Sequence, residues 1–272
     1  MILAHASPTP NEPLRCERLG AVALLTLNRP EARNSLSEAL LIAMAAEFET
    51  IAADPAVRAV VIAAHGPAFS AGHDLKELNA RRADADGGRA YFARIMRLCC
   101  DVMMQIVRLP QPVIAAVQGT ATAAGCQLVA SCDLAVASAA ARFATPGVNI
   151  GLFCSTPMVA LSRNVAPKHA MELLLTGDAI TAEDALRIGL INHVVTAGTE
   201  RDQALALARK LAAKSRHVVK IGKEAFYHQI DMDLASAYDY AATVMVDNMM
   251  AKDACEGISA FIEKRAAKWQ DS

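Results

Sequence analysis

The stretch GTATAAGCQLVASCD, residues 119–133, decides how the chain around it folds. It follows a short apolar run, residues 112–117, which predicts a buried strand, and it opens an alanine-rich segment that suits a helix. Glycine and small residues at a turn from strand to helix let a ligand approach the backbone closely. They also leave N–H groups free where the helix begins. We therefore expect a turn here that can hold a developing oxyanion.

The segments on either side alternate between strand and helix patterns. Ser35 and Glu38 form a capping-box pattern ahead of apolar residues at helical spacing, which predicts a helix that ends at about residue 53. From Thr199 onward the pattern is almost entirely helical. The expected fold class is α/β, with a core over residues 1–200 and a C-terminal helical region over residues 201–272. Apolar, β-prone runs predict strands at residues 21–27, 57–63, 113–117, 134–137, 142–144 and 193–195.

Composition excludes several classes of protein. The 272 residues carry a formal net charge of −1, which gives no electrostatic case for a nucleic acid or an anionic membrane as partner. No apolar run approaches the roughly 20 residues that span a bilayer. Residues 1–20 lack the features of a secretion signal or an organelle transit peptide. The seven cysteines show no CxxC pair and no zinc-ligand spacing, so we expect reduced thiols, no metal site and a cytoplasmic location.

Several ordered motifs resemble the crotonase (enoyl-CoA hydratase/isomerase) superfamily over roughly residues 20–266. Three stretches, residues 72–78, 121–133 and 143–157, resemble one branch of hydratase-domain proteins within it. The motifs are NRP at residues 28–30, DPAVRAVV at 54–61, FSAGHDLKE at 69–77, PVIAAVQG at 112–119, LTGD at 175–178, ALRIGL at 185–190 and FIEKR at 261–265.

The resemblance implies a crotonase-type spiral of ββα units, with C-terminal helices that build a homotrimer or a dimer of trimers. It also implies a coenzyme A thioester as ligand and no permanently bound cofactor. By position, the backbone N–H groups of His73 and Ala124 are expected to form the oxyanion hole for the thioester carbonyl. The implied substrate-binding positions are Arg33, Ala71, Asp74, Leu75, Lys76, Phe261 and Lys264, of which Phe261 and Lys264 lie on a helix that in relatives reaches the coenzyme A of a neighbouring subunit.

Two positions depart from the family pattern. Related hydratases use two glutamates to activate water and to deliver a proton to the α-carbon. The first aligns with Gln127 and the second with Gly147. An amide does not exchange a proton near neutral pH, and glycine has no side chain. Because general acid–base help is typically worth about 10²–10⁴-fold, we expect ordinary hydration to be nearly abolished.

Other local side chains are candidates to replace the missing carboxylates. The His73 ring can act as a base near neutral pH. The thiol of Cys154 lies just before a predicted helix, whose dipole can lower a thiol pKa. The amides of Gln127 and Asn149 can hold a water or polarise a substrate.

Three functional hypotheses follow. The chain is a nominal enoyl-CoA hydratase with weak or altered activity, or a non-catalytic acyl-CoA-binding protein, or a thioester hydrolase that uses Cys154 or His73. The fold is the same in all three, so the fold alone does not choose among them.

Overall fold

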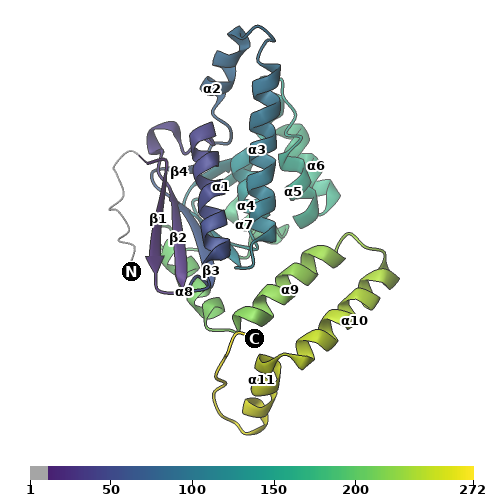
Figure 1. Cartoon of the computed structure of the whole chain (residues 1–272). Coiled ribbons are helices and arrows are strands. Elements are labelled where there is room, and N and C mark those ends of the chain that lie inside the picture. The colour runs from purple at the N-terminus through teal and green to yellow at the C-terminus, as the bar shows by residue number, and fades with distance from the viewer. Residues whose placement is uncertain (1–11) are drawn as a thin grey trace.

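The computed structural model describes residues 12–272 and contains two β-sheets (Figure 1). The larger sheet has the strand order β1-β2-β3-β5-β7-β10. Its first pair is antiparallel and every other neighbouring pair is parallel. Its strands are β1 (Leu14–Leu19), β2 (Val22–Leu27), β3 (Ala59–Ala64), β5 (Val113–Val117), β7 (Leu134–Ser138) and β10 (His193–Val195).

Both faces of this sheet are covered, which is why its central strands are continuous apolar runs. On β2, Leu25 and Leu27 face the main core beneath α1 and α3, whereas Val22 and Leu24 face a second cluster. That second cluster is closed by Ala204, Leu205 and Ala208 of α8.

The smaller sheet has the order β4-β6-β8-β9, in which β4, β6 and β8 are parallel. Each of these three strands comes directly after a strand of the larger sheet and is followed by helix. The chain therefore winds as a spiral of repeated ββα units, as the resemblance implied. The strands are β4 (Ala68–Ser70), β6 (Thr120–Thr122), β8 (Arg142–Ala144) and β9 (Ile180–Thr181).

The helices pack on both sides of the sheets, and α1 and α3 lie side by side (Figure 1). The N-terminal cap of α1 differs from the predicted capping box. The Leu40 N–H donates to the Ser37 hydroxyl over 3.3 Å, while the Ser35 hydroxyl donates to Asp74 Oδ2 over 3.0 Å. The predicted cap at Ser35 is therefore wrong, because that hydroxyl is committed to a distant loop. The helices are α1 (Glu38–Ala53), α2 (Leu75–Ala80), α3 (Arg89–Arg108), α4 (Ala124–Ser131), α5 (Pro157–Asn164), α6 (Pro167–Thr176), α7 (Ala182–Arg187), α8 (Glu200–Ala212), α9 (Arg216–Gln229), α10 (Leu234–Met250) and α11 (Lys252–Ile262), with short 3₁₀ turns η1 (Pro30–Ala32), η2 (Arg81–Ala83) and η3 (Pro146–Ile150).

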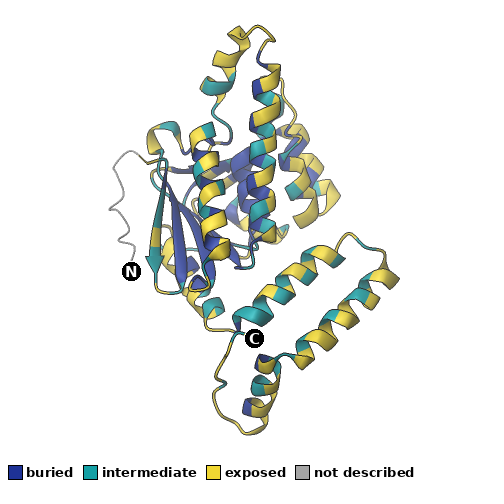
Figure 2. Ribbon diagram, viewed as in Figure 1, coloured by how far each residue is buried: buried dark blue, intermediate teal, exposed yellow. Residues whose placement is uncertain are grey.

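The last three helices form a C-terminal arm (α9–α11) that projects from the core (Figure 1). Figure 2 shows dark blue, buried residues concentrated in the strands and α4, whereas α9 and α10 are yellow and teal. The arm is anchored by Lys223, whose ammonium group donates to Asp133 Oδ2 over 2.6 Å. Since α8 lies on the sheet, the projecting part starts at α9, and the division at residue 200 stays a prediction. None of the helices within residues 12–272 combines the length and apolar character needed to cross a bilayer.

Candidate active site

Three loops meet at one edge of the smaller sheet. Because β4, β6 and β8 are parallel, their carboxyl ends lie at the same edge, in the register Ser70↔Ala121 and Thr122↔Ala144. β4 leads to His73, β6 leads to Ala124, and β8 leads to Gly147. The three turns of the spiral thus bring together the positions that the sequence separates by about fifty and about twenty residues.

The two expected oxyanion donors lie in loops that touch. A Cβ built on Gly72 would lie 2.9 Å from Ala123 Cβ and 3.1 Å from the Ala124 nitrogen. Only glycine fits this contact, and its φ of +84° also favours glycine. Neither the His73 N–H nor the Ala124 N–H donates a hydrogen bond to any part of the chain that the structure describes. Two backbone donors without a partner among the described residues therefore lie in touching loops.

The residue before the second donor has a strained backbone. Ala123 has φ 50° and ψ −120°, a region that L-amino acids rarely adopt, and such a conformation costs about 1–3 kcal/mol. Its N–H donates to the Ala144 carbonyl over 2.9 Å, which fixes the turn. The strain sets the direction of the next N–H, that of Ala124, at the first position of α4.

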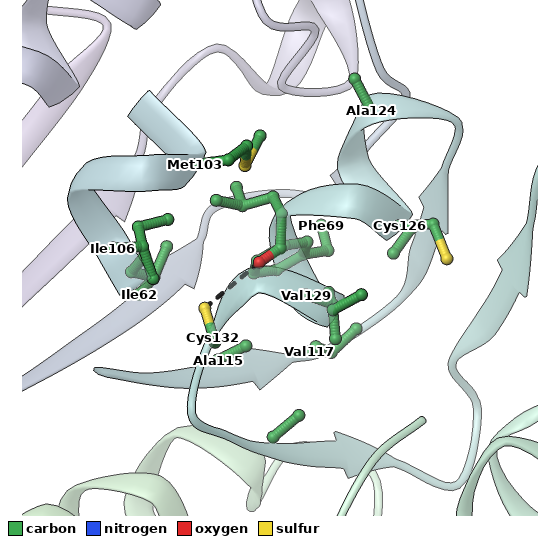
Figure 3. Packing of buried hydrophobic residues seen from close by; sticks show 14 of the residues in the cluster. Ile62, Phe69, Met103, Ile106, Ala115, Val117, Ala124, Cys126, Val129 and Cys132 are labelled. Carbon is green, nitrogen blue, oxygen red and sulfur yellow. Dashed lines mark hydrogen bonds between the residues drawn. The ribbon is translucent and has the colours of Figure 1, made fainter. Parts of the chain in front are cut away.

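Helix α4 is a rigid support for that N–H. Every residue from Ala124 to Ser131 is buried. A side chain at Gly125 would collide with the Ser70 carbonyl oxygen, so glycine allows the helix to pack directly on β4. Figure 3 shows Val129 of this helix near Phe69 and Val117, and the Cys132 thiol donating to the Leu128 carbonyl at the end of the helix. The predicted turn and helix are confirmed.

Asp74 organises the loop that carries His73. It caps α2 by accepting from the Lys76 and Glu77 N–H groups, and its Oδ2 accepts from Arg29 over 3.1 Å and from Ser35 over 3.0 Å. Burial alone would raise the pKa of Asp74, but these hydrogen bonds outweigh it and hold the pKa below its ordinary value. Asp74 is therefore ionised near neutral pH and anchors the loop.

The other residues expected around coenzyme A divide into two groups. The carbonyl of Arg33 accepts from the Ala71 N–H over 3.0 Å, so these two positions lie together beside the His73 loop, and Leu75 and Lys76 are exposed on the first turn of α2. Within one chain, however, Phe261 and Lys264 are far from this loop. They lie at the end of α11, at the opposite end of the molecule from α2 (Figure 1).

Gln127 is 4% exposed, and its Oε1 has no hydrogen-bond partner among the described residues. Its own N–H donates to the Ala123 carbonyl, so it lies one helical turn beyond the strained residue. A buried amide oxygen without a donor costs free energy, which is the usual sign of a missing ligand or water.

The position of the second glutamate is filled by another part of the chain. A Cβ built on Gly147 would lie 2.8 Å from the Leu152 carbonyl oxygen and 2.9 Å from Cys154 Sγ. The Leu152 N–H also donates to the Gly147 carbonyl over 2.9 Å, which closes residues 152–154 over this glycine. The loop leaves no room for a side chain there.

The structure gives no support to an activated Cys154 thiol, which stays a prediction. Burial raises the pKa of this thiol above its ordinary value, and a hydrogen bond from the Gly147 N–H offsets only part of that effect. Helix α5 begins three residues later, at Pro157, so its dipole acts less directly than expected.

Burial lowers the pKa of the His73 imidazole, which is therefore neutral near pH 7, and its Nε2 has no partner among the described residues. Asn149 lies elsewhere. Its Nδ2 is 2.9 Å from where a Cβ on Gly177 would stand, at the end of α6. The structure therefore places the Asn149 amide against α6.

One polar residue at this edge escaped the sequence reasoning. Thr145 follows β8 and is 1% exposed, yet its hydroxyl has no partner in residues 12–272. The available signal was its place directly after a strand that ends at the same edge as β4 and β6. Across the described residues no group of three or more His, Cys, Asp or Glu side chains is arranged to hold a metal ion.

Comparisons with known proteins agree with this fold. A family profile described as Enoyl-CoA hydratase/isomerase matches residues 17–272. The rat protein named enoyl-CoA hydratase domain-containing protein 3, mitochondrial, is 49% identical over 245 residues, which cover 90% of this chain and 80% of the rat protein. The crystal structure of an enoyl-CoA hydratase from Mycobacterium smegmatis has a TM-score of 0.89 and 53% identity, and covers 94% of this chain and 98% of its own. The crystal structure of human enoyl-CoA hydratase domain-containing protein 3 has a TM-score of 0.90 and 47% identity, and covers 94% and 100%.

The names of these relatives overturn one expectation. The rat protein is named mitochondrial, which contradicts the cytoplasmic location expected for this chain. Cysteines without disulfide partners distinguish a reducing compartment from an oxidising one. They do not distinguish one reducing compartment from another. The reasoning about a leader also rested partly on residues 1–11, which lie outside the described residues.

The spiral of ββα units and the family match over nearly the whole chain point the same way. This chain belongs to the enoyl-CoA hydratase/isomerase (crotonase) family, in the branch of enoyl-CoA hydratase domain-containing protein 3.

Proposed function

We propose that this chain binds coenzyme A thioesters and holds the thioester carbonyl oxygen between the N–H groups of His73 and Ala124. The observation that carries the proposal is the pair of unpartnered donors in touching loops. Fixed dipoles aimed at an oxygen that gains negative charge stabilise it without having to reorganise. Arg33 and Lys76, at the edge of the same loops, supply positive charge for the phosphates of coenzyme A.

Hydration of an enoyl thioester by this site is weak. The reaction needs one group that removes a proton from water and one that delivers a proton to the α-carbon. Gln127 exchanges no proton near neutral pH, and Gly147 has no side chain. The loss is expected to be about 10²–10⁴-fold relative to a site with working acid and base.

A second candidate function is binding without turnover. The observation that favours it is the closure of residues 152–154 over Gly147, which occupies the place of the second carboxylate. The thioester hydrolase hypothesis loses its support from Cys154, since the thiolate is the nucleophile and the pKa of this thiol is raised. For His73 the lowered pKa leaves a neutral imidazole that is a weaker base than usual.

We also propose that copies of this chain cover the C-terminal arm, as a trimer or a dimer of trimers. Leu234 is 75% exposed and Phe261 is 84% exposed in the single chain. Exposed apolar area on this scale marks an interaction surface. Such an assembly would also let Phe261 and Lys264 reach the coenzyme A of a neighbouring copy. Light scattering on a size-exclusion column tests it, and a monomer at micromolar concentration would contradict it.

The thioester proposal is tested by removing one N–H group. Ala124 is the first residue of α4, where proline is tolerated because its missing N–H has no helical partner. The strained Ala123 precedes it, so the substitution is made in an Ala123→Gly background, and Ala123→Gly alone is the matched control. Adding Ala124→Pro should weaken binding of butyryl-CoA about fivefold in calorimetry, since a net hydrogen bond is worth about 1 kcal/mol. Free coenzyme A should bind both variants equally.

Two results would contradict the proposal. The first is that butyryl-CoA binds the intact protein no more tightly than free coenzyme A, and the second is that Ala124→Pro leaves the affinity for butyryl-CoA unchanged. Hydration is followed in parallel as the loss of the conjugated thioester of crotonyl-CoA. Rapid hydration that survives Gln127→Ala would show that the missing carboxylates do not limit the reaction.

A further inference from the structure

The peptide group that carries the His73 N–H is held by its carbonyl. That carbonyl, which belongs to Gly72, accepts from the Leu36 N–H over 2.7 Å, and Leu36 and His73 pair as a parallel β-bridge. A planar trans peptide directs its N–H opposite to its carbonyl. The His73 N–H therefore points away from Leu36, and its direction depends on how Gly72 is held.

Ser70 holds the other side of Gly72. It is 0% exposed, at the end of β4. Its hydroxyl accepts from the Gly72 N–H over 3.3 Å and donates to the Asn34 carbonyl over 2.8 Å. One hydrogen bond to Leu36 and one to Ser70 thus hold the two peptide groups on either side of the Gly72 α-carbon.

The acceptor of the Ser70 hydroxyl is itself fixed in the fold. Asn34 is 0% exposed, and its Oδ1 accepts from the Arg29 N–H over 2.8 Å. Its Nδ2 donates to the carbonyls of His65 and Ala68, each over 2.8 Å. The position of the Ser70 hydroxyl is therefore set by a buried network of backbone groups, which rigidifies the loop that it supports.

The same serine also touches the helix that carries the second donor. A Cβ built on Gly125 would lie 2.2 Å from the Ser70 carbonyl oxygen and 2.8 Å from Ser70 Cβ. Gly125 follows Ala124 directly. Ser70 thus lies between the supports of the two donors, because its hydroxyl holds the residue before His73 and its backbone packs against the residue after Ala124.

We propose that Ser70 is a positioning residue that fixes the direction of the His73 N–H and its spacing from the Ala124 N–H. This proposal rests on the proposed function, because it takes these two N–H groups to receive the thioester carbonyl. Ser70 is fully buried, so it acts through its neighbours in the chain and does not touch the ligand. Hydrogen bonds weaken steeply when their distance and angle depart from the optimum, so a displaced donor stabilises the oxygen less.

Ser70→Ala tests this role, because it removes the hydroxyl and keeps the Cβ that lies against Gly125. The readout is the carbonyl stretching frequency of bound butyryl-CoA, labelled with carbon-13 at the carbonyl, by difference infrared spectroscopy. The fall in frequency on binding should be smaller in the variant. In calorimetry the affinity for butyryl-CoA should drop about threefold, which is less than the loss of a whole hydrogen bond, and the affinity for free coenzyme A should stay unchanged.

Ser138→Ala is the matched control. Ser138 is 1% exposed at the end of β7 in the larger sheet, and its hydroxyl accepts from the N–H of Ala140, two residues further on, over 3.0 Å. This substitution should also lower stability in urea, and it should leave the carbonyl frequency and both affinities unchanged. Ser70→Cys keeps the volume and a weak donor and acceptor, so its frequency should lie between those of the wild type and Ser70→Ala. If Ser70→Ala does not fold, Ser70→Cys supplies the same comparison.

The outcomes distinguish the positioning role from the proposed function. A carbonyl frequency in the Ser70 variants equal to that of the wild type would overturn the positioning role and leave the thioester proposal standing. The same conclusion follows if Ser138→Ala reduces the frequency shift as much as Ser70→Ala does. A wild-type protein that produces no shift and binds butyryl-CoA no more tightly than free coenzyme A would instead overturn the proposed function itself.

Discussion

Replacing Gly147 by alanine tests whether the second catalytic position is closed by packing. The added Cβ would lie 2.8 Å from the Leu152 carbonyl oxygen, 2.9 Å from Cys154 Sγ and 3.3 Å from the Cys154 nitrogen. Two of these three atoms are backbone, so a change of side-chain rotamer does not relieve the contact. The backbone of Gly147 is outside the left-handed region, so the effect of alanine comes from packing and chain entropy alone.

The magnitude follows from two opposing effects. Overpacking a tight site costs about 1–3 kcal/mol. Replacing glycine by alanine restricts the unfolded chain and returns about 0.4–1 kcal/mol. We therefore expect Gly147→Ala to lower the free energy of unfolding by about 1–2 kcal/mol.

Urea unfolding of the two proteins at neutral pH measures this difference. Gly222→Ala is the control, because Gly222 lies inside α9 with nothing within 4 Å of a built Cβ. It should raise stability by about 1 kcal/mol, as alanine does in a helix interior. Combining Gly147→Ala with Cys154→Ala should recover part of the loss, since one of the three contacts is then removed.

A Gly147→Ala protein as stable as the wild type would refute the reasoning. It would mean that residues 152–154 move aside freely, and that the second carboxylate is absent for a reason other than lack of space. With the loop in place, restoring both glutamates by Gln127→Glu and Gly147→Glu should not restore rapid hydration of crotonyl-CoA.

Three further predictions concern titration and anchoring. The pKa of the Asp74 carboxyl is lowered on folding, so the stabilisation it provides is complete above its unfolded-state pKa and is lost as the pH falls through its folded-state pKa. Asp74→Asn should therefore cost about 2 kcal/mol at pH 7 and less at pH 3, and an equal cost at both pH values would contradict this. The raised pKa of Cys154 predicts that iodoacetamide alkylates this thiol slowly at pH 7. In a mass-spectrometric time course, the exposed Cys255 should be modified first, and the reverse order would contradict the prediction. Lys223→Met leaves the Asp133 carboxylate without its buried cation, so the substitution should lower the free energy of unfolding by about 3–5 kcal/mol. A loss below about 1 kcal/mol would show that this ion pair does not anchor the arm.

Local signals predicted the elements better than they predicted the contacts between them. The apolar run before Gly119 and the small residues after it gave the strand, the turn and α4 correctly, because these follow from nearby residues. The cap of α1 was assigned to Ser35 and belongs to Ser37. Both hydroxyls suit a cap, and only the distant Asp74 decides which is free to serve.

The positions that form the candidate site could be predicted from the sequence. The chemistry available at those positions could be described only from the folded structure. His73 and Ala124 could be named because a backbone N–H does not depend on the side chain. Cys154 fills the space at Gly147, which is a contact between a residue inside η3 and one beyond its end, and no periodicity in the sequence predicts it. The buried, unpartnered hydroxyl of Thr145 was missed for the same reason, since burial of a single polar atom depends on what packs against it.

The most direct test of the central claim is the carbonyl stretching frequency of a bound thioester, measured by difference infrared spectroscopy with butyryl-CoA labelled with carbon-13 at the carbonyl. Two N–H groups donating to the carbonyl oxygen weaken the carbon–oxygen double bond. The frequency should therefore fall on binding relative to the thioester in water, and the shift should shrink when Ala124→Pro is added to the Ala123→Gly background. A bound thioester whose frequency equals or exceeds its value in water would contradict the assignment of His73 and Ala124 as the oxyanion hole.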